Sequence, residues 1–503
     1  MWSAWVRWGI GAAPVLYLGV LLVGYHLTGT AQRHHVESAW YIFAAAALGL
    51  ALFSRGRRPD LIAGSPQRGS LRDRLTVAVV AILASAILYL PVVSTGLLSD
   101  DFVLTGMPLV GGWEFVRPLP LLLWSVIAPA AGPSGLHLLN IVLHGVNAAL
   151  VFALSTAVLP SSGRPVGVLA AALFITSPVA VEPVAWCAGV FDVTLVTSGL
   201  VYLLVLAEGR SAGWTTLWAV TSLAMALACK ETAVALPAMG LLLALRRPVR
   251  WQALLASAAA ATAYGGVRAI SAPGILTGVS LRYVGKELIS RPFAALAEPW
   301  TSSDLGSVPL LLGVLVPLGY ALVILGYVLG RRADWRGLST AAWVIAGGGP
   351  VLAYFYVGPD LSGSRYVYLP LVGGVLLLAE TGWEQGSEFA RRVAIGFLAC
   401  VAIAGVVGSG RRLAAWKDAA ALRDAVLVQA GRAIRENGCA AAVLMGAPEI
   451  DNGAFVFRNG LPEAVRRISG VHVVTARTAE IPAQCTLTWR QGEGFTPATP
   501  AAP

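Results

Sequence analysis

The chain has 503 residues, of which 57% are hydrophobic and only 12% are charged. A soluble domain carries about 25% charged residues, so this composition excludes an ordinary soluble enzyme. The formal net charge is +10, and in a membrane protein such an excess of arginine indicates orientation before it indicates nucleic-acid binding. Because the apolar residues occur in runs close to the ~20 residues that cross a bilayer, the sequence predicts a polytopic integral membrane protein.

Apolar runs separated by Pro, Gly and charged clusters predict about thirteen spanning helices. They are expected at 9–27, 38–54, 75–94, 136–159, 165–181, 190–208, 214–229, 232–246, 251–270, 308–330, 338–356, 366–381 and 393–409. The first run resembles the apolar part of a signal peptide. It lacks a convincing cleavage site and is followed by further spans, so it is interpreted as the first helix.

Arginine clusters recur in alternate loops of this arrangement. They are found within 55–74, at 164, within 246–250, within 331–336 and at 391–392. Loops rich in Lys and Arg are cytoplasmic, so the N-terminus is expected inside and, with an odd number of spans, the C-terminal tail outside. The longer outer segments 95–135 and 271–307, with the shorter 357–365, are predicted to hold short interfacial helices, with ordinary loops as the alternative.

The tail after residue 410 changes to short helical and strand-like patterns. Helices are expected at 413–436 and 462–468, and strands at 441–445, 454–457, 472–476 and 486–489. The tail is therefore predicted to be a small α/β domain, followed by a disordered Pro- and Ala-rich end at 496–503. An extracytoplasmic location permits a disulfide between Cys439 and Cys485, with two free thiols as the alternative.

Two adjacent carboxylates, Asp100 and Asp101, follow the third expected span. Neighbouring carboxylates raise each other's pKa values, and partial burial adds to that effect. One of the two can therefore serve as a general base toward an acceptor hydroxyl. A solvated pair of loop residues is the alternative interpretation.

Three polar residues of the next helix, His137, Asn140 and His144, are spaced to lie on one face. A polar stripe on a spanning helix faces the protein interior or a cavity. Hydrogen bonding between packed helices is the alternative to a binding role, and a metal site would need a third ligand.

Four further charged residues interrupt apolar sequence, and they are Glu182, Asp192, Lys230 and Glu231. Asp192 opens a helix, where the helix dipole favours a carboxylate. Lys230 and Glu231 can form a structural ion pair, or Lys230 can bind a phosphate as a point charge. All four are candidates for substrate binding.

Arg365, Tyr366 and Tyr368 begin the twelfth expected span from the outer side, and Arg117 precedes Pro118 in the first outer segment. An arginine at that depth can extend its head group to the interface or clamp a phosphate with two hydrogen bonds. Arg365 and its tyrosines are therefore candidates for binding a phosphate at the lipid head-group level.

In this order the motifs resemble the GT-C superfamily of polyprenyl-phosphate-dependent glycosyltransferases, and among them the transmembrane and tetratricopeptide-repeat O-mannosyltransferases. Protein O-mannosyltransferases and lipid A aminoarabinose transferases are more distantly similar. The resemblance rests on Asp100-Asp101, Arg117-Pro118, the His137–His144 helix, Ser177-Pro178 through Glu182 to Asp192, Lys230-Glu231, Arg365-Tyr366 and Tyr368-Leu369-Pro370.

The resemblance covers roughly 75–380 and implies four parts. They are two additional spans with a cytoplasmic loop (1–74), a GT-C-like catalytic domain (75–410), the α/β domain (411–495) and the tail (496–503). It implies an all-α membrane fold apart from the small α/β domain, without the repeats of the repeat-bearing enzymes. The location implied is the bacterial cytoplasmic (inner) membrane.

The activity implied is inverting transfer of a sugar from a polyprenyl-phosphate donor to an acceptor hydroxyl on the extracytoplasmic face. Asp100 is the candidate base, with Asp101 next, and Arg365 and Lys230 would stabilise the departing phosphate. Arg117, His137, His144, Glu182, Asp192, Glu231, Tyr366 and Tyr368 are the other candidate substrate-binding residues. No cofactor is expected, although a divalent metal at the two aspartates is conceivable, and the acceptor is left open among protein, glycan and lipid.

The sequence also departs from the family pattern. Ser177 stands where a His is expected before Pro178, and Phe191 where an Arg is expected before Asp192. These changes keep open a non-catalytic scaffold of GT-C type. A transporter or flippase for a lipid-linked solute is a separate alternative, although transporters often show internal repeats and the sequence shows no clear repeat. The resemblance gives no reason to expect a nucleic-acid partner.

Overall fold

The computed structural model describes most of the chain from residue 71 onward. The described ranges are 71–107, 117–159, 163–209, 211–271, 309–330, 335–352, 360–475 and 485–490, with short pieces at 291–293, 295–296, 299, 355, 357–358, 492 and 494–497. The expected spans 9–27 and 38–54 and most of the segment 271–307 lie outside these residues.

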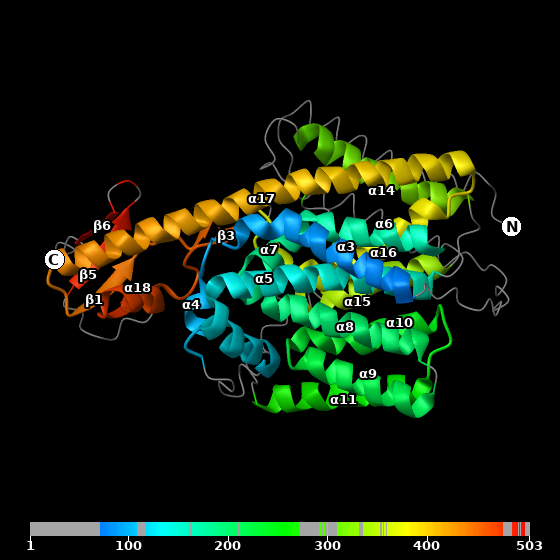
Figure 1. Ribbon diagram of the computed structural model, residues 1–503, viewed down its shortest axis with the longest axis horizontal. Coiled ribbons are helices and arrows are strands. Elements are labelled where there is room, and N and C mark those ends of the chain that lie inside the picture. The colour runs from blue at the N-terminus through cyan, green and yellow to red at the C-terminus, as the bar shows by residue number, and fades with distance from the viewer. Residues whose placement is uncertain are drawn as a thin grey trace.

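Every expected span from 75–94 onward coincides with a helix (Figure 1). The helices are α3 (Leu71–Tyr89), α5 (Pro118–Val158), α6 (Gly163–Thr176), α8 (Val190–Glu208), α9 (Ala212–Leu227), α10 (Leu236–Ala244), α11 (Trp251–Ser271), α14 (Pro309–Gly330), α15 (Trp335–Leu352), α16 (Tyr368–Trp383) and α17 (Glu388–Glu436). Within the described residues, five helical segments are long and apolar enough to cross a membrane, or six if a bent pair at α6 counts as one span. The chain is an integral membrane protein, while the total of thirteen spans stays a prediction.

Helix α5 is two helices joined at a kink. Gly132 has φ 63° and ψ −163°, between Pro129 and Pro133, and a positive φ of this kind is available mainly to glycine. The piece before the kink belongs to the outer segment 95–135, which also holds the short helix α4 (Asp100–Leu104). This segment therefore contains the short helices that the sequence predicts, and they start at the end of the bundle from which α17 leaves it (Figure 1).

Close helix packing holds α3 against α5. A Cβ atom on Gly145 would lie 2.5 Å from the Cα atom of Ile82, so the two backbones meet without a side chain between them. Ser85 on α3 donates a hydrogen bond to the carbonyl of Ile141 on α5 at 2.7 Å. This packing fixes the end of α3, from which the acidic loop emerges.

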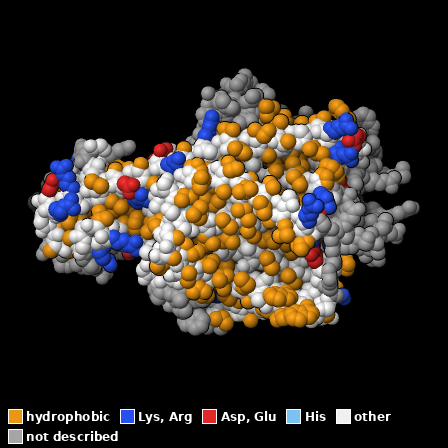
Figure 2. Space-filling view, viewed as in Figure 1, with side chains coloured by type: hydrophobic (Ala, Val, Ile, Leu, Met, Phe, Trp, Pro, Cys, Tyr) orange, Lys and Arg blue, Asp and Glu red, His pale blue; other side chains and the backbone are white. Residues whose placement is uncertain are grey.

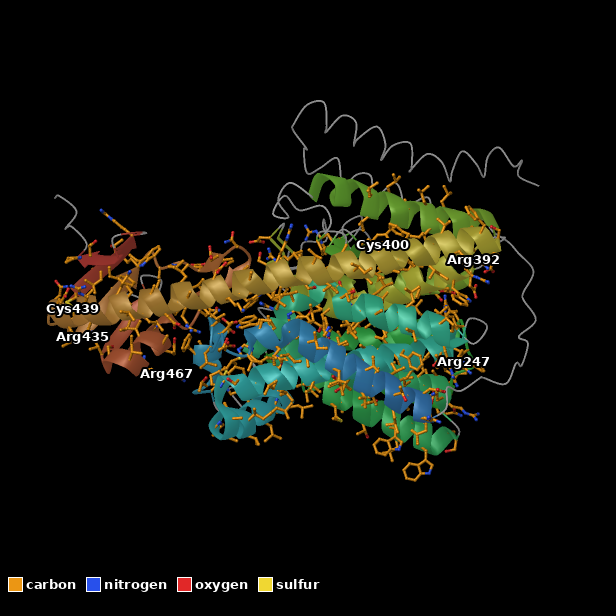
Figure 3. The ribbon with its side chains drawn as sticks, turned by 45° about the horizontal axis from the view of Figure 1, so that its top comes forward. Arg247, Arg392, Cys400, Arg435, Cys439 and Arg467 are labelled. Carbon is orange, nitrogen blue, oxygen red and sulfur yellow. A yellow bond between two sulfur atoms is a disulfide. The ribbon has the colours of Figure 1, made fainter. Side chains whose placement is uncertain are left out.

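Ion pairs hold arginines of the expected cytoplasmic loops to neighbouring helices or, for Arg391 and Arg392, to Glu388 of the same helix. The pairs are Arg74–Glu208, Arg164–Asp73, Arg246–Glu380, Arg391–Glu388 and Arg392–Glu388. Arg247 and Arg392 lie at one end of the molecule, while Arg435 and Arg467 lie at the other (Figure 3). Apolar side chains cover the bundle face between these ends (Figure 2), as expected for a surface in contact with lipid.

The last span does not end near residue 409, contrary to the expected separation of a span at 393–409 from a helix at 413–436. Both belong to α17, one helix of 49 residues. Its glycines allow close contact instead of ending the helix. A Cβ on Gly405 would lie 2.5 Å from the Thr176 carbonyl oxygen, and one on Gly408 would lie 3.0 Å from Pro178 Cγ.

The C-terminal domain is a small α/β unit on the far half of α17. Its sheet has the order β4-β1-β5-β6, with β1 (Ala441–Met445) parallel to β4 (His472–Thr475) and to β5 (Cys485–Arg490). Strand β6 (Gly494–Pro497) is antiparallel to β5. The expected disorder from residue 496 is therefore wrong for 496–497, because Thr496 and Pro497 belong to β6 and pair with Thr488 and Leu487 of β5. Residues 498–503 lie outside the described residues.

Two smaller elements connect β1 to β4. Strands β2 (Ile450–Asp451) and β3 (Ala454–Phe455) form a separate hairpin, and helix α18 (Leu461–Ser469) follows it. A disulfide joins Cys439, just after α17, to Cys485 at the start of β5, which decides between the bridge and the two free thiols. The segment between β3 and α18 faces the helical bundle and forms part of the cavity described next.

Candidate functional site

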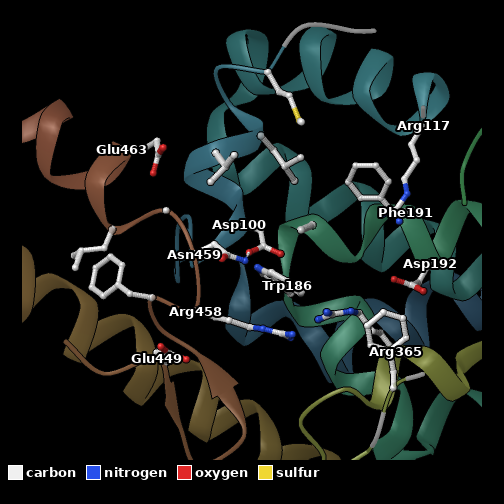
Figure 4. A pocket seen from close by; sticks show the side chains of 18 of the residues that line it. Asp100, Arg117, Trp186, Phe191, Asp192, Arg365, Glu449, Arg458, Asn459 and Glu463 are labelled. Atoms are coloured by element: carbon white, nitrogen blue, oxygen red, sulfur yellow. Dashed lines mark hydrogen bonds between the residues drawn. The ribbon is translucent and has the colours of Figure 1, made fainter. Parts of the chain in front are cut away.

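A cavity of about 710 Å³ lies between the end of the bundle that carries α4 and the C-terminal domain (Figure 4). The bundle contributes Asp100, Arg117, Asp192, Lys230, Glu231, Arg365 and Tyr366, among others. The C-terminal domain contributes the end of β1 with the residues after it, and the residues from Phe457 to Glu463. Most of the polar residues predicted from widely separated motifs therefore meet around one space.

The structure gives the two adjacent aspartates different surroundings. Asp100 is half-buried and lines the cavity, where one carboxylate oxygen accepts a hydrogen bond from Asn459 Nδ2 at 2.6 Å. Asp101 is fully buried, and its two oxygens accept from the backbone N–H groups of Leu98 and Ala188, each at 2.8 Å.

Burial raises the pKa of Asp101 well above its ordinary value, and the two backbone N–H groups act in the opposite direction. Its carboxyl links the acidic loop to the start of α8 and does not line the cavity. Asp100 is therefore the aspartate of this pair that a substrate can reach.

The backbone before Asp100 is in an uncommon conformation. Ser99 has φ 50°, a value that costs a residue other than glycine of order 1–3 kcal/mol and persists only where its surroundings hold it. Here the Ser99 N–H donates to the Val456 carbonyl at 3.0 Å. Arg423 of α17 donates to the carbonyls of Thr95 and Leu97 at 2.6 and 2.7 Å. The C-terminal part of the chain thus fixes the direction of Asp100.

Three cations of the bundle lie at the cavity, each paired with a carboxylate. Lys230 Nζ lies 2.5 Å from Asp192, and both side chains are less than a tenth exposed. Arg117 makes two hydrogen bonds to Glu231 at 2.6 and 3.0 Å. Arg365 lies 2.6 Å from the buried Glu182, which supports the arginine from behind because Glu182 is not among the residues that line the cavity.

These pairs arise where helices are interrupted. Asp192 lies in the first turn of α8, where the helix dipole favours a carboxylate. Lys230 occupies the break between α9 and the short 3₁₀ helix Glu231–Ala235.

Aromatic rings surround the Arg365 guanidinium. Its carbon lies 4.7 Å from the ring of Trp186, 4.8 Å from Tyr366 and 5.2 Å from Phe455. Trp186 is held by a hydrogen bond from its indole N–H to the Leu98 carbonyl at 3.0 Å. Such stacking restrains a guanidinium and leaves its N–H donors directed edgewise, an arrangement suited to binding an oxyanion.

His137, His144 and Tyr368 lie in the interior of the bundle, and the main cavity is lined without them. His144 Nδ1 hydrogen-bonds to the Tyr368 hydroxyl at 2.7 Å, and His137 Nε2 lies 3.2 Å from the Gly96 carbonyl oxygen. Asn140 donates to the Trp186 carbonyl at 2.7 Å. These contacts correspond to the packing interpretation of the polar stripe, with His137 supporting the acidic loop from below.

The Phe191 departure also lies at the cavity. Its ring faces Arg117, whose guanidinium carbon is 5.6 Å from the ring centroid. A cation is thus present beside this position, although it comes from the start of α5. Ser177 precedes the short 3₁₀ helix Pro178–Ala180, and it does not line the cavity.

Sequence reasoning missed the residues that the C-terminal domain brings to the cavity, of which Arg458 and Asn459 approach Asp100 and Arg365 most directly (Figure 4). One signal was available. Arg423 continues the apolar face that Trp416, Ala419 and Val426 form on α17, and an arginine at a core position needs buried acceptors. Among the described residues there is no group of three or more His, Cys, Asp or Glu placed to hold a metal ion.

Comparison with known proteins gives one partial relative. The protein O-mannosyl-transferase Tmtc1 of Drosophila melanogaster is 40% identical over 148 residues, which are 27% of this chain and 16% of that protein. The chain thus spans about a sixth of the length of this relative. No protein-family model matches the chain.

Three solved structures are similar at low identity. ArnT from Cupriavidus metallidurans bound to undecaprenyl phosphate is 14% identical with a TM-score of 0.41, covering 80% of this chain and 85% of that one. The oligosaccharyltransferase AglB from Archaeoglobus fulgidus, in complex with an inhibitory peptide and a dolichol-phosphate, is 10% identical with a TM-score of 0.40, covering 80% and 64%. The mycobacterial arabinofuranosyltransferase AftD is 13% identical with a TM-score of 0.37, covering 82% and 32%. These similar proteins belong to the GT-C glycosyltransferases, the group that the sequence motifs resemble.

Proposed function

We propose that this protein transfers a sugar from a polyprenyl-phosphate donor to an acceptor hydroxyl at the end of the bundle that carries Asp100. The observation that carries the proposal is the cavity itself. It brings the carboxylate of Asp100, which lines the cavity and has no ion-pair partner among the described residues, to the same space as the cations Lys230 and Arg365. A base on one side and cations on another are what displacement of a phosphate by a hydroxyl requires.

In the proposed reaction Asp100 accepts the proton of the acceptor hydroxyl as its oxygen attacks the anomeric carbon. The bond between that carbon and the phosphate oxygen breaks, and the phosphate departs with the electron pair. A single displacement of this kind inverts the anomeric configuration. Because the departing polyprenyl phosphate is a good leaving group, stabilisation by Arg365 and Lys230 can replace protonation by an acid.

The lining of the cavity suits a lipid-linked donor. Val103, Leu104 and Met107 lie beside Asp100, and Val351 and Phe355 lie beside the cations. These side chains offer an apolar path next to the phosphate-binding groups, as an isoprenoid chain attached to a phosphate needs. The exposed apolar side chains of α3 and α5, among them Val80, Leu83 and Val126, support a position of this end of the cavity beside the membrane.

Two further observations support an extracytoplasmic position of the cavity. Arg247 and Arg392, which belong to expected cytoplasmic loops, lie at the end of the bundle opposite the C-terminal domain (Figure 3), and loops rich in arginine favour the cytoplasmic side. The C-terminal domain holds the Cys439–Cys485 disulfide, which persists in oxidising compartments. The cavity is therefore proposed to open on the extracytoplasmic side.

Cysteine labelling tests this orientation. Arg435→Cys and Arg392→Cys change exposed residues at opposite ends of the molecule and are made in a Cys400→Ser background, because Cys400 is an exposed free cysteine. A membrane-impermeant maleimide added to intact cells is expected to label the first variant and not the second. Labelling of Arg392→Cys alone would reverse the proposed orientation.

Donor consumption tests the activity. Purified protein is incubated with radiolabelled sugars on undecaprenyl phosphate and, separately, on nucleotide diphosphates, together with hydroxyl acceptors of peptide, glycan and lipid type. Release of undecaprenyl phosphate with transfer of label is expected for at least one lipid-linked sugar. Transfer from nucleotide sugars alone would refute the proposal. Movement of a lipid-linked sugar across proteoliposomes without its consumption would identify a flippase.

A further inference from the structure

Among the residues that the structure describes, the bundle side of the cavity carries no excess of positive charge. Arg117, Lys230 and Arg365 are matched by Glu231, Asp192 and Glu182 in the three ion pairs. Asp100 then leaves this side negative. A phosphate entering here meets cations whose charge is already balanced, so binding it tightly needs a cation beyond those of the bundle residues that the structure describes.

Arg458 of the C-terminal domain lies where such a cation is needed. It extends from the C-terminal wall of the cavity toward Arg365 (Figure 4). Its guanidinium carbon lies 5.3 Å from the centroid of the Phe455 ring, and that of Arg365 lies 5.2 Å from the same centroid. Both guanidinium groups therefore lie beside the same ring, and the distance between their carbon atoms cannot exceed these two distances added together. Glu449 and Glu463 line the same wall of the cavity, but within the part of the chain that the structure describes Arg458 is held by the Phe455 ring and not by an ion pair.

The backbone that carries Arg458 is fixed on both sides. Before it, the Val456 carbonyl accepts the Ser99 N–H at 3.0 Å, and Phe457 stacks on Phe102 with centroids 6.3 Å apart. After it, Asn459 binds the Asp100 carboxylate at 2.6 Å.

Gly460 completes this contact. It has φ +81°, and a Cβ there would lie 2.4 Å from the Ser99 carbonyl oxygen. The segment 456–460 therefore packs closely on the acidic loop. This contact fixes the positions of both the Asp100 carboxylate and the Arg458 guanidinium.

We propose that Arg458 and Arg365 together bind the phosphate of the lipid carrier, so that the C-terminal domain supplies part of the donor site. Two guanidinium groups beside one aromatic ring repel each other. An oxyanion between them removes that repulsion and accepts hydrogen bonds from their N–H groups. The inference deepens the proposed function and rests on it for the identity of the ligand. Its geometry depends only on an oxyanion.

Binding of undecaprenyl phosphate to purified full-length protein tests the proposal without requiring transfer. Arg458→Gln is expected to weaken binding about 10- to 100-fold, the loss typical of one charge-assisted hydrogen-bonding group, and Arg458→Lys to weaken it less. Undecaprenol, which lacks the phosphate, is expected to bind wild type and Arg458→Gln equally. Arg466→Gln is the matched control, because Arg466 is an exposed arginine of α18 that does not line the cavity.

The outcomes separate the two proposals. Equal affinity of wild type and Arg458→Gln for undecaprenyl phosphate would overturn the role of Arg458 while leaving the proposed transferase intact. Failure of the wild type to bind undecaprenyl phosphate would overturn the lipid-linked donor itself. Inorganic phosphate is added as a competitor, and displacement of the lipid at equal concentration would show a site for free phosphate instead of a lipid carrier.

Discussion

Replacing Asp100 by Asn is expected to lower the rate of sugar transfer about 10²- to 10⁴-fold, the contribution typical of a positioned general base. The change keeps the size of the side chain and removes its ability to take up a proton. Its amide oxygen can still accept the hydrogen bond from Asn459, so the docked segment 456–460 is expected to stay in place. Transfer kinetics with a lipid-linked donor and thermal unfolding in detergent measure the two effects separately.

Asp101→Asn is the matched control, because the same substitution meets a different environment one residue later. The Asp101 carboxylate accepts from Leu98 and Ala188 through separate oxygens, whereas an amide has one acceptor and must turn its NH₂ group toward one of these donors. Leaving a buried N–H unpaired costs about 1–3 kcal/mol, so the main loss is expected in stability. Full transfer by Asp100→Asn would show that Asp100 is not the base. Loss of transfer without loss of stability in Asp101→Asn would also contradict the assignment of the base to Asp100.

Replacing Arg365 by Gln is expected to reduce both stability and activity. Its partner Glu182 is 3% exposed, and removing one member of a buried ion pair costs about 3–5 kcal/mol because the other charge remains unpaired. In the double variant Arg365→Gln with Glu182→Gln the unpaired charge is absent, so stability is expected to recover. Transfer is expected to stay low, because the proposed phosphate ligand is still missing.

A second buried pair at the other end of the bundle provides the control. Arg246 and Glu380 lie 2.8 Å apart with side chains 3% and 2% exposed. The double variant Arg246→Gln with Glu380→Gln removes a comparable pair far from the cavity, and it is expected to keep the affinity for undecaprenyl phosphate. If Arg365→Gln with Glu182→Gln recovers stability and also full transfer, Arg365 has only a structural role.

The sequence predicts the helices of this fold well because each is a long apolar run with a clear start and end. The prediction of helix ends fails where glycines permit close packing and do not end the helix. The sequence predicts a break at 410–412, yet α17 continues through it, and the nearby Gly405 and Gly408 let the helix approach Thr176 and Pro178. Only the neighbouring helix distinguishes a glycine that ends a helix from one that permits close contact. The local sequence does not show which helix will lie beside it.

The candidate site was predictable only in part, for the same reason. Asp100, Lys230 and Arg365 stand out because charge interrupts apolar sequence, and burying charge is costly. Arg458 and Asn459 belong to a polar loop before α18, where such residues are ordinary. Their significance comes from docking against Ser99 and Asp100, hundreds of positions earlier in the chain. The opposite surroundings of Asp100 and Asp101 likewise depend on tertiary contacts that adjacent identical residues do not reveal.

The unbroken backbone of α17 links the bilayer mechanically to the cavity. At 1.5 Å per residue, its 49 residues form a rod about 73 Å long. A change in tilt of about 5° about its membrane end would carry the far end roughly 6 Å, more than twice the 2.6 Å between Asn459 and Asp100. Because packing against neighbouring helices sets the tilt of a span, the close contacts of Gly405 with Thr176 and of Gly408 with Pro178 also keep the two halves of this site aligned.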